Sequence, residues 1–406
     1  MSLDIRPVVS ALLRNRTGAL LVAVQIAITL AVLVNAVYIV HQRIEKIGRP
    51  TLIDDRNLFA IDIAEFTERF NYDAAVHEDL AYLRGLPGVV SASISNSVPL
   101  GISGSATTAW TQPNTKGNKS QLNYFSMDER GLETLGVRLI AGRAFRADEI
   151  LPPLTPKNYA DFIPQLIVTQ AAADKLFPHD NALGKTVYDA TGKSATITGI
   201  IDNMIGTGWS GYEAVDHVAI FPRLPRLYGF QYLVRTEPGR RDALMRQAEE
   251  HLSTSNPDRV IKWVRSVEFF KGFLYRDDRN MEVFLVTVTV LLLAIACLGI
   301  FGLATFNVSI RTKQIGTRRA VGARRADIVR YFMVENGLIT TAGIVVGCAL
   351  ALAVGYWLSL QYQLPRLDLY YLVGGVLALW AIGQLAAWQP ARRASAVSPS
   401  VATRTV

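Results

Sequence analysis

The sequence has few of the residues on which most catalytic and metal-binding sites depend. Its only two cysteines, Cys297 and Cys348, both lie inside long apolar runs, so no disulfide framework is indicated. The five histidines have no pairwise spacing typical of metal ligands, and we interpret them as lone surface residues. No serine lies in a G-x-S-x-G nucleophile elbow. We therefore predict a non-catalytic chain with no metal site.

The chain also lacks a complete phosphate-binding loop. The triplets at 184–186 (GKT) and 192–194 (GKS) resemble the end of such a loop. The loop needs a further glycine five residues before the second one, where its backbone amides wrap the phosphates. His179 and Val187 occupy these positions. We predict that the chain itself binds no cofactor and that both triplets are hairpin or turn residues.

Charge is missing from four apolar stretches, at 18–40, 283–306, 336–358 and 370–388. Each is close to the roughly 20 residues that a helix needs to cross the hydrocarbon core. Half of all residues are hydrophobic and only 19% are charged, which is too apolar for an ordinary soluble protein. The residues between the first two stretches have the composition of a water-soluble domain. We predict an α-helical membrane protein with four transmembrane helices and a large α+β periplasmic domain between helices 1 and 2.

The net charge of +8 is unevenly distributed. Segments 1–17, 307–330 and 389–406 hold 13 of the Lys and Arg residues against only Asp4 and Asp327. The rest of the chain is therefore net negative, which argues against a nucleic-acid-binding face. Short basic segments that alternate with non-basic ones indicate a cytoplasmic location, so both termini and the 307–330 loop are predicted to be cytoplasmic.

These patterns predict a complete set of boundaries. In order, they are a cytoplasmic N-terminus (1–17), helix 1 (18–40), the periplasmic domain (41–280), helix 2 (281–306), a cytoplasmic coupling loop (307–331), helix 3 (332–358), a periplasmic loop (359–369), helix 4 (370–388) and a cytoplasmic tail (389–406).

The large domain shows a loose internal duplication. Strand-like, helical and strand-like patterns follow one another in 51–100 and again in 229–268. Two βαβ units of this kind can form one split α+β sheet. The intervening residues 101–228 are predicted to be an inserted, β-rich subdomain, with a hairpin that turns at Thr191 and Gly192. Gly, Ser and Thr dominate residues 101–120, which we predict to be a mobile loop.

Polar residues are few inside the apolar stretches. Gln25, Asn35 and Gln384 lie within them, and Glu335 lies at the mouth of the third. A chain of intramembrane carboxylates, typical of a proton-driven carrier, is missing. A small-x-x-x-small pair, Gly343 and Gly347, predicts close helix packing, either within the chain or at a dimer seam.

The segment after the second apolar stretch is strongly basic. It carries seven Lys and Arg residues between 311 and 330 and one aspartate. We predict a helix with Val308, Ile315 and Ala320 among the basic residues, ended by Gly322. A second helix would begin at Arg324, with Ile328, Val329 and Phe332 leading into the third transmembrane helix. The residues alone favour two interpretations equally: a rigid elbow that transmits force to a soluble partner, and a basic helix on anionic lipid headgroups.

The stretch RTKQIGTRRAVGARRADIVRYFMVEN, 311–336, resembles the signature of the FtsX-like permeases. In that family the signature reads approximately R-x-K-E-I-G-x-x-R-A-x-G-A, followed by a basic pair, D-I and a later E. The positions that match this signature are Arg311, Lys313, Ile315, Gly316, Arg319, Ala320, Gly322, Ala323, Asp327, Ile328 and Glu335. All of them except Ile328 are expected to contact or couple to an ATPase. The tail PARRASAVSPSVA is similar to the closing segment of the same family.

The stretches GLETLGVRLIAGRAFRADE (131–149), QLIVTQAAADKLFPHDNALGKTVY (165–188) and ATITGIIDNM (195–204) are similar to the periplasmic core domain of MacB-type exporters. The resemblance implies a type VII ABC permease in the bacterial inner membrane, driven by a cytoplasmic ABC ATPase that holds the ATP and Mg. It also implies a second permease subunit, in a homodimer or heterodimer. A periplasmic adaptor or hydrolase and the membrane lipid are further expected partners.

The sequence departs from the family in two places. Gln314, still expected at the ATPase contact, replaces the usual glutamate, and only about 17 residues precede helix 1, so we expect the ATPase on another polypeptide. The expected function is export or extraction of a substrate, such as a peptide, an antibiotic or lipoprotein-type cargo, by ATP-driven motion of the periplasmic domain. The alternative is a signalling subunit that activates a periplasmic cell-wall hydrolase without transport.

Overall fold

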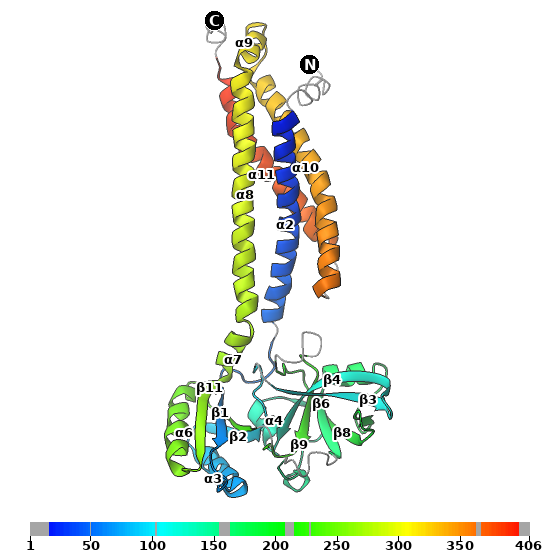
Figure 1. Ribbon diagram of the computed structural model, residues 1–406, viewed down its shortest axis with the longest axis vertical. Coiled ribbons are helices and arrows are strands. Elements are labelled where there is room, and N and C mark those ends of the chain that lie inside the picture. Colours follow the sequence, from blue (N-terminus) through cyan, green and yellow to red (C-terminus); the bar gives the residue numbers. More distant parts are fainter. Residues whose placement is uncertain are drawn as a thin grey trace. The chain divides into compact units, whose positions relative to one another are not determined.

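The computed structural model describes residues 16–48, 50–101, 104–153, 163–207, 215–226, 229–362 and 367–397. They form two compact units, which we call the helical unit (Met1–Gly48 with Asp278–Val406) and the head unit (Arg49–Asp277). Figure 1 shows long helices in the first and a sheet with short helices in the second. Most of the predicted N-terminal segment, half of the predicted tail and part of the 359–369 loop lie outside the described residues.

Four helices in the described residues are long and apolar enough to cross a membrane. They are α2 (Arg16–Gly48), α8 (Arg276–Ile310), α10 (Arg325–Tyr362) and α11 (Leu369–Ser395). Each contains one of the four apolar stretches of the sequence, because an uncharged run of that length satisfies its backbone polar groups internally only as a helix. The prediction of four transmembrane helices is therefore confirmed at the level of fold class.

Helix α2 lies at the centre of the helical unit. In its most apolar stretch of 18 residues 56% is buried, and the helix packs against both α10 and α11. Ile26 and Leu30 of α2 are fully buried. In the corresponding stretch of α8 only 11% is buried, and Ala296 and Ile300 are its buried apolar residues. Most of the apolar surface of α8 is therefore available to lipid or to another protein.

The small residues of α10 allow it to approach α2 closely. A Cβ added at Gly343 would lie 2.7 Å from the carbonyl oxygen of Ala23, and one added at Gly347 would lie 3.0 Å from that of Ala27. The predicted small-x-x-x-small pair is thus used within the chain, where two helix backbones meet.

Replacing Gly343 by leucine is expected to lower the thermal unfolding midpoint of the helical unit. The new side chain has no room against the α2 backbone, and overpacking of this kind costs about 1 to 3 kcal/mol. The control is Gly302→Leu on α8, because a Cβ there meets nothing within 4 Å. Both variants gain the same helix propensity, so equal midpoints would contradict the close approach.

The first part of the head unit is a split βαβ pair. Its elements are β1 (Leu58–Glu65), α3 (Tyr72–Gly85), β2 (Val89–Ser95), β10 (Phe230–Thr236), α6 (Arg241–Ser255) and β11 (Arg259–Ser266). The strands lie in the order β11-β1-β10-β2, and all neighbours are antiparallel. Consequently β1 and β2 run parallel with β10 between them, as the internal duplication predicts. Asn71 caps α3 by accepting a hydrogen bond from the Ala74 amide.

The second part of the head unit is rich in strands. Its elements are β3 (Ser105–Gln112), β4 (Lys116–Met127), α4 (Gly131–Leu135), β5 (Leu139–Gly142), a 3-10 turn (Ala147–Glu149), β6 (Gln165–Thr169), α5 (Gln170–Leu176), β7 (Thr186–Tyr188), β8 (Ser194–Ile201) and β9 (Val218–Pro222). One residue pair, Ser95 with Met127, joins this part to the first through β2 and β4. The predicted hairpin is present as β7 and β8, with Gly192 at a φ of 84° in its turn.

The prediction of a mobile loop at 101–120 is wrong for most of its length. Residues 105–112 form β3, which pairs with β4 from Ser105 to Gln112. Ile102 and Ser103 lie outside the described residues. A composition rich in Gly, Ser and Thr is typical of irregular structure, but β-branched threonine also favours a half-buried strand that has a partner. Whether such a stretch forms a loop or a strand depends on a partner strand, which the local sequence does not identify.

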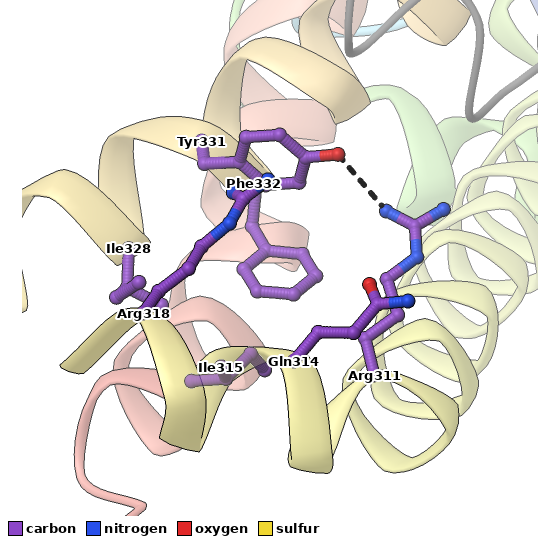
Figure 2. A pocket seen from close by; sticks show the side chains of 7 residues that line it. All are labelled: Arg311, Gln314, Ile315, Arg318, Ile328, Tyr331 and Phe332. Carbon is purple, nitrogen blue, oxygen red and sulfur yellow. Dashed lines mark hydrogen bonds between the residues drawn. The ribbon is translucent and has the colours of Figure 1, made fainter. Parts of the chain in front are cut away.

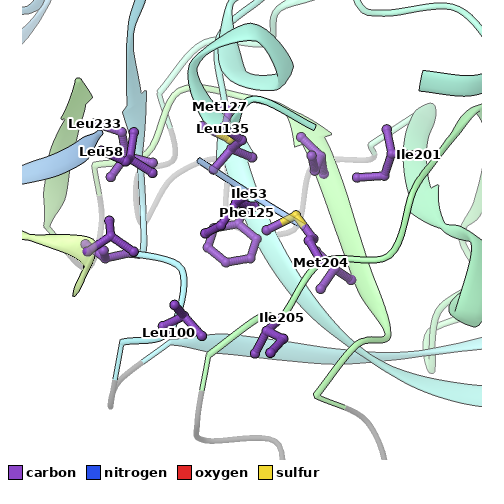
Figure 3. Packing of buried hydrophobic residues seen from close by; sticks show 14 of the residues in the cluster. Ile53, Leu58, Leu100, Phe125, Met127, Leu135, Ile201, Met204, Ile205 and Leu233 are labelled. Atoms are coloured by element: carbon purple, nitrogen blue, oxygen red, sulfur yellow. The ribbon is translucent and has the colours of Figure 1, made fainter. Parts of the chain in front are cut away.

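One hydrophobic cluster is shared by the two parts of the head unit. Leu58 and Leu233 come from the βαβ pair, and Phe125 and Ile201 come from the strand-rich part (Figure 3). Helix α7 (Val267–Leu274) adds two further buried residues from the end of the head unit. Because the cluster takes residues from both, the parts are packed on each other over a common core as well as joined by the chain.

Candidate coupling element

A short helix links two of the long helices of the helical unit. Helix α8 ends at Ile310, α9 spans Thr312–Ala320, and α10 begins at Arg325. Gly322 lies in the turn at a φ of 103°, which favours glycine. Asp327, the third residue of α10, accepts a hydrogen bond at 3.0 Å from the amide of Arg324, which precedes the helix, as in one half of a capping box. The predicted break at Gly322 and the second helix starting at Arg324 agree with this geometry.

The start of α9 is fixed by a buried ion pair. Arg311 donates to Glu335 of α10 at 2.8 Å and to the Tyr331 hydroxyl at 3.3 Å. The side chain of Glu335 is 3% exposed and that of Arg311 is 15% exposed. Figure 2 shows the Arg311 guanidinium beside the Tyr331 hydroxyl. The pair therefore connects the junction of α8 and α9 to the third long helix.

The end of α9 is fixed by backbone carbonyls. The Arg319 side chain donates to the carbonyl oxygens of Ser395 at 3.1 Å and Val397 at 2.8 Å. Both acceptors lie where α11 ends, and Arg319 therefore satisfies carbonyls that the helix leaves without an internal partner. As a result α9 is attached to α10 at one end and to α11 at the other.

A small hydrophobic cluster lies beneath α9. Ile315 packs with Ile328 and Phe332 of α10, and with Ala391 and Ala394 of α11. A pocket opens beside it, lined by Arg311, Gln314, Ile315, Arg318, Ile328, Tyr331 and Phe332 (Figure 2). The Arg318 guanidinium lies over the Tyr331 ring at 5.1 Å. The pocket thus has an apolar floor and a basic rim.

The eleven predicted site residues lie in one region but in different environments. The exposed ones are Lys313, Gln314, Ala320, Gly322 and Asp327; the half-buried ones are Arg311, Arg319 and Ala323; the buried ones are Ile315, Gly316 and Glu335. Of the two apolar residues of α9 that the sequence places among the basic ones, Ile315 is buried and Ala320 is exposed. Five residues turn a helix well past one full turn, so Ala320 lies on a different face of α9 from Ile315.

Three residues that the sequence analysis did not assign also belong to this region. Arg318 and Tyr331 form the rim of the pocket, and Val321 is 85% exposed at the turn after α9. An apolar residue at a turn between two basic stretches is the signal that could have identified Val321. The described part of the chain contains no group of His, Cys, Asp and Glu residues that could hold a metal ion.

Two family models match the chain. An FtsX-like permease C-terminal model matches residues 286–399, and a MacB-like periplasmic core domain model matches residues 19–251. The second match covers more than half of the chain and includes most of the head unit.

Similar proteins carry matching names. The macrolide export ATP-binding/permease protein MacB of Neisseria meningitidis serogroup B is 25% identical over 296 residues, which are 68% of this chain and 42% of that protein. The protein of the same name from Shigella flexneri is 30% identical over 159 residues, 38% of this chain and 23% of that protein. The chain thus spans less than half the length of these curated relatives.

Among solved structures, the periplasmic region of MacB from Actinobacillus actinomycetemcomitans is 14% identical, with a TM-score of 0.34, and covers 56% of this chain and 97% of that one. The family-model matches, four membrane-length helices and an α+β domain between the first two lead to one assignment. The chain belongs to the family of MacB-like and FtsX-like ABC transporter permeases.

Proposed function

We propose that this permease subunit couples ATP hydrolysis, in a cytoplasmic ABC ATPase subunit that binds ATP and Mg, to motion of its head unit. The observation that carries the proposal is the attachment of α9 at both ends, to α10 through Arg311 and to α11 through Arg319. A helix held in this way moves together with the long helices, so force applied to its exposed face reaches them. A freely hinged loop would absorb the same force.

We propose a location in the bacterial inner membrane, with both termini and α9 in the cytoplasm and the head unit in the periplasm. The support is the charge pattern, because α9 and the start of α10 carry a dense set of arginines that would be costly to move across the bilayer. The exposed basic residues Lys313 and Arg318 also suit an acidic surface on the ATPase.

We propose export or extraction as the task of the complete machine, with peptide, antibiotic or lipoprotein-type cargo. The support is the family assignment together with relatives named for macrolide export. A second permease subunit is part of the same proposal, and the exposed apolar surface of α8 suits contact with lipid or with that subunit.

The coupling role is tested with Val321→Asp. Val321 is 85% exposed, so the change should leave folding intact, whereas a charge on Ile315 would be buried in the cluster beneath α9. At the centre of an interface such a change typically costs about 2 kcal/mol or more, which is roughly a thirtyfold loss of affinity. We expect weaker ATPase binding and loss of permease-stimulated ATP hydrolysis in reconstituted nanodiscs.

The matched control is Val260→Asp, an exposed valine on β11 of the head unit. It introduces the same charge at a site that the proposal does not use, and it should bind the ATPase as the parent does. Undiminished ATPase affinity and stimulation in Val321→Asp would contradict the proposed contact. An equal loss in both variants would point to a general charge effect instead.

A further inference from the structure

Helix α11 exposes an apolar stripe along its membrane-length span. Val373, Leu377, Trp380, Leu385 and Trp388 are between 47% and 74% exposed. They are three to five residues apart, so they lie on one side of a helix that turns once every 3.6 residues. The opposite side, with Leu372, Leu379 and Ala387, is buried within the helical unit. The exposed stripe therefore suits the acyl chains of the bilayer.

The stripe ends in an aromatic residue and then in two arginines. Arg392 follows Trp388 by four residues and Leu385 by seven, so it lies on the same side of α11. Arg393 lies beside it, and both arginines are exposed. Tryptophan is enriched where the membrane meets water. One further helical turn, about 5.4 Å, takes Arg392 into the headgroup layer, which is roughly 5 to 7 Å thick on each side of the bilayer core.

The charge of the two arginines is not balanced by nearby carboxylates that are free to pair. Within the described residues 307–362 and 367–397 there are three carboxylates. Glu335 pairs with Arg311, Asp327 serves the turn before α10, and Asp368 precedes the opposite end of α11. The end of α11 therefore presents a positive pair directly beyond an apolar, lipid-facing stripe.

This combination favours a phospholipid over the ATPase as the partner of the two arginines. Lys313 and Arg318, which suit the ATPase, lie on the short helix α9, which carries no such stripe. By contrast, Arg392 continues a face whose preceding turns expose Leu385 and Trp388. A phospholipid matches both parts of that face, because it joins apolar chains to a phosphate group that guanidinium binds well.

We propose that the end of α11 is a binding site for an anionic phospholipid. The phosphate is bound by Arg392, Arg393 adds positive charge beside it, and an acyl chain lies along Leu385 and Trp388. A zwitterionic lipid has the same phosphate and chains, but its cationic group offsets the attraction. An anionic headgroup is therefore the preferred ligand.

The site lies beside the attachment of α9. The carbonyl oxygen of Ser395, three residues after Arg392, accepts a hydrogen bond from Arg319 at 3.1 Å. Figure 1 shows α9 close to this end of α11. A bound lipid would hold the same helix end that holds α9, and any effect of the lipid on ATPase stimulation rests on the coupling role proposed above. Lipid binding itself needs no ATPase, so it is tested separately.

The test compares two lipids that differ in headgroup charge. The full chain in detergent is titrated with dioleoylphosphatidylglycerol or with dioleoylphosphatidylcholine, and native mass spectrometry measures the bound lipid. We expect the first phosphatidylglycerol to bind about fivefold or more tightly than the first phosphatidylcholine, because one arginine near the membrane surface typically contributes that factor. Equal affinity for the two lipids would overturn the proposed site.

Paired substitutions locate the binding. Arg392→Gln with Arg393→Gln should remove the preference for phosphatidylglycerol, and both changes are at exposed positions where glutamine keeps the helix propensity. Arg392→Lys with Arg393→Lys keeps the charge and should retain most of the preference. The matched control, Lys313→Gln with Arg318→Gln, removes two charges from α9 and should leave the preference unchanged.

Three outcomes would contradict the location. An undiminished preference in the glutamine pair on α11 would place the lipid elsewhere. An equal loss in the control pair would show a general effect of charge. If the glutamine pair on α11 kept the lipid preference and lost affinity for the ATPase, the two arginines would belong to the ATPase contact.

Discussion

Replacing Arg311 by methionine is expected to lower the free energy of unfolding of the helical unit by about 3 to 5 kcal/mol, the usual cost of leaving a buried charge without its partner. Glu335 would keep its carboxyl group, without its Arg311 partner, at a site where its side chain is 3% exposed. The same change releases the start of α9 from α10, so ATPase stimulation by the permease should fall together with stability.

The opposite variant, Glu335→Leu, should be less damaging. Arg311 is more exposed than its partner, and its long side chain can turn its charge toward water. The double variant, Arg311→Met with Glu335→Leu, should recover much of the stability, since no buried charge remains. Recovered stability without recovered ATPase stimulation would separate the mechanical role of the pair from its contribution to folding.

The native cysteines provide a measurement that is specific to the helical unit. Cys297 lies on α8 and Cys348 on α10, and the head unit has no cysteine. A thiol-reactive fluorogenic dye therefore reports unfolding of the helices during a thermal ramp. Arg330→Met, at an exposed arginine of α10, is the matched control and should leave the midpoint unchanged. Equal midpoints for Arg311→Met and Arg330→Met would contradict a structural role for the ion pair.

The membrane helices and the turn at Gly322 could be predicted because their causes are local. A run of about 20 uncharged residues specifies a membrane helix without reference to the rest of the chain. A glycine between two helical patterns specifies a left-handed break in the same way. The hairpin at Gly192 and the repeated βαβ pattern belong to this class too, since each depends on the order and spacing of neighbouring residues.

The contacts that attach α9 to α10 and α11 have no comparable signal in the local sequence. Arg311 and Glu335 are 24 residues apart and meet only because the chain reverses at the Gly322 turn. Arg319 binds backbone carbonyls 76 and 78 residues away, and a carbonyl oxygen is present at every position of the sequence. The sequence could therefore group these arginines in one candidate coupling element but could not identify what they contact.

Strands β4, β3, β7, β8, β6 and β9 of the head unit close into a ring through the pairing of β9 with β4, and the sequence alone does not predict this closure for a related reason. Its closure depends on the parallel pairing of β4 with β9, which joins Asn123 to Val218 across most of the strand-rich part. Such long-range pairing is determined by packing against both neighbours and not by the strand's own residues. The Thr-rich residues of β3 likewise form a strand only beside β4, and their sequence alone therefore predicts a loop.

Replacing Asp79 by leucine is expected to destabilise the βαβ pair of the head unit by about 3 to 5 kcal/mol. Asp79 on α3 is 5% exposed and forms an ion pair with Arg259 at the start of β11. It also accepts a hydrogen bond of 2.7 Å from the Tyr232 hydroxyl on β10. Burial, followed by the charge and hydrogen bond of Asp79, raises the pKa of Tyr232 well above its usual value, so Tyr232 remains a neutral donor.

Without Asp79 the Arg259 guanidinium stays buried and retains only its bonds to the Leu252 carbonyl and the Ser255 hydroxyl of α6. The double variant Asp79→Leu with Arg259→Met should therefore be more stable than Asp79→Leu alone. Tyr232→Phe removes one hydrogen bond and leaves the ion pair, so its cost should be smaller, about 1.5 to 3 kcal/mol.

Hydrogen exchange of the full chain in nanodiscs distinguishes a loss of stability confined to the βαβ pair from a loss throughout the chain. The carboxylate joins α3 to β10 and β11, so these elements and α6 should lose protection in Asp79→Leu. Helix α9 belongs to the other compact unit and should exchange as in the parent. If α9 also lost protection, the two units would share one folding transition. A force on α9 would then affect the head unit in two ways: through the long helices, and because the two units are stabilised together.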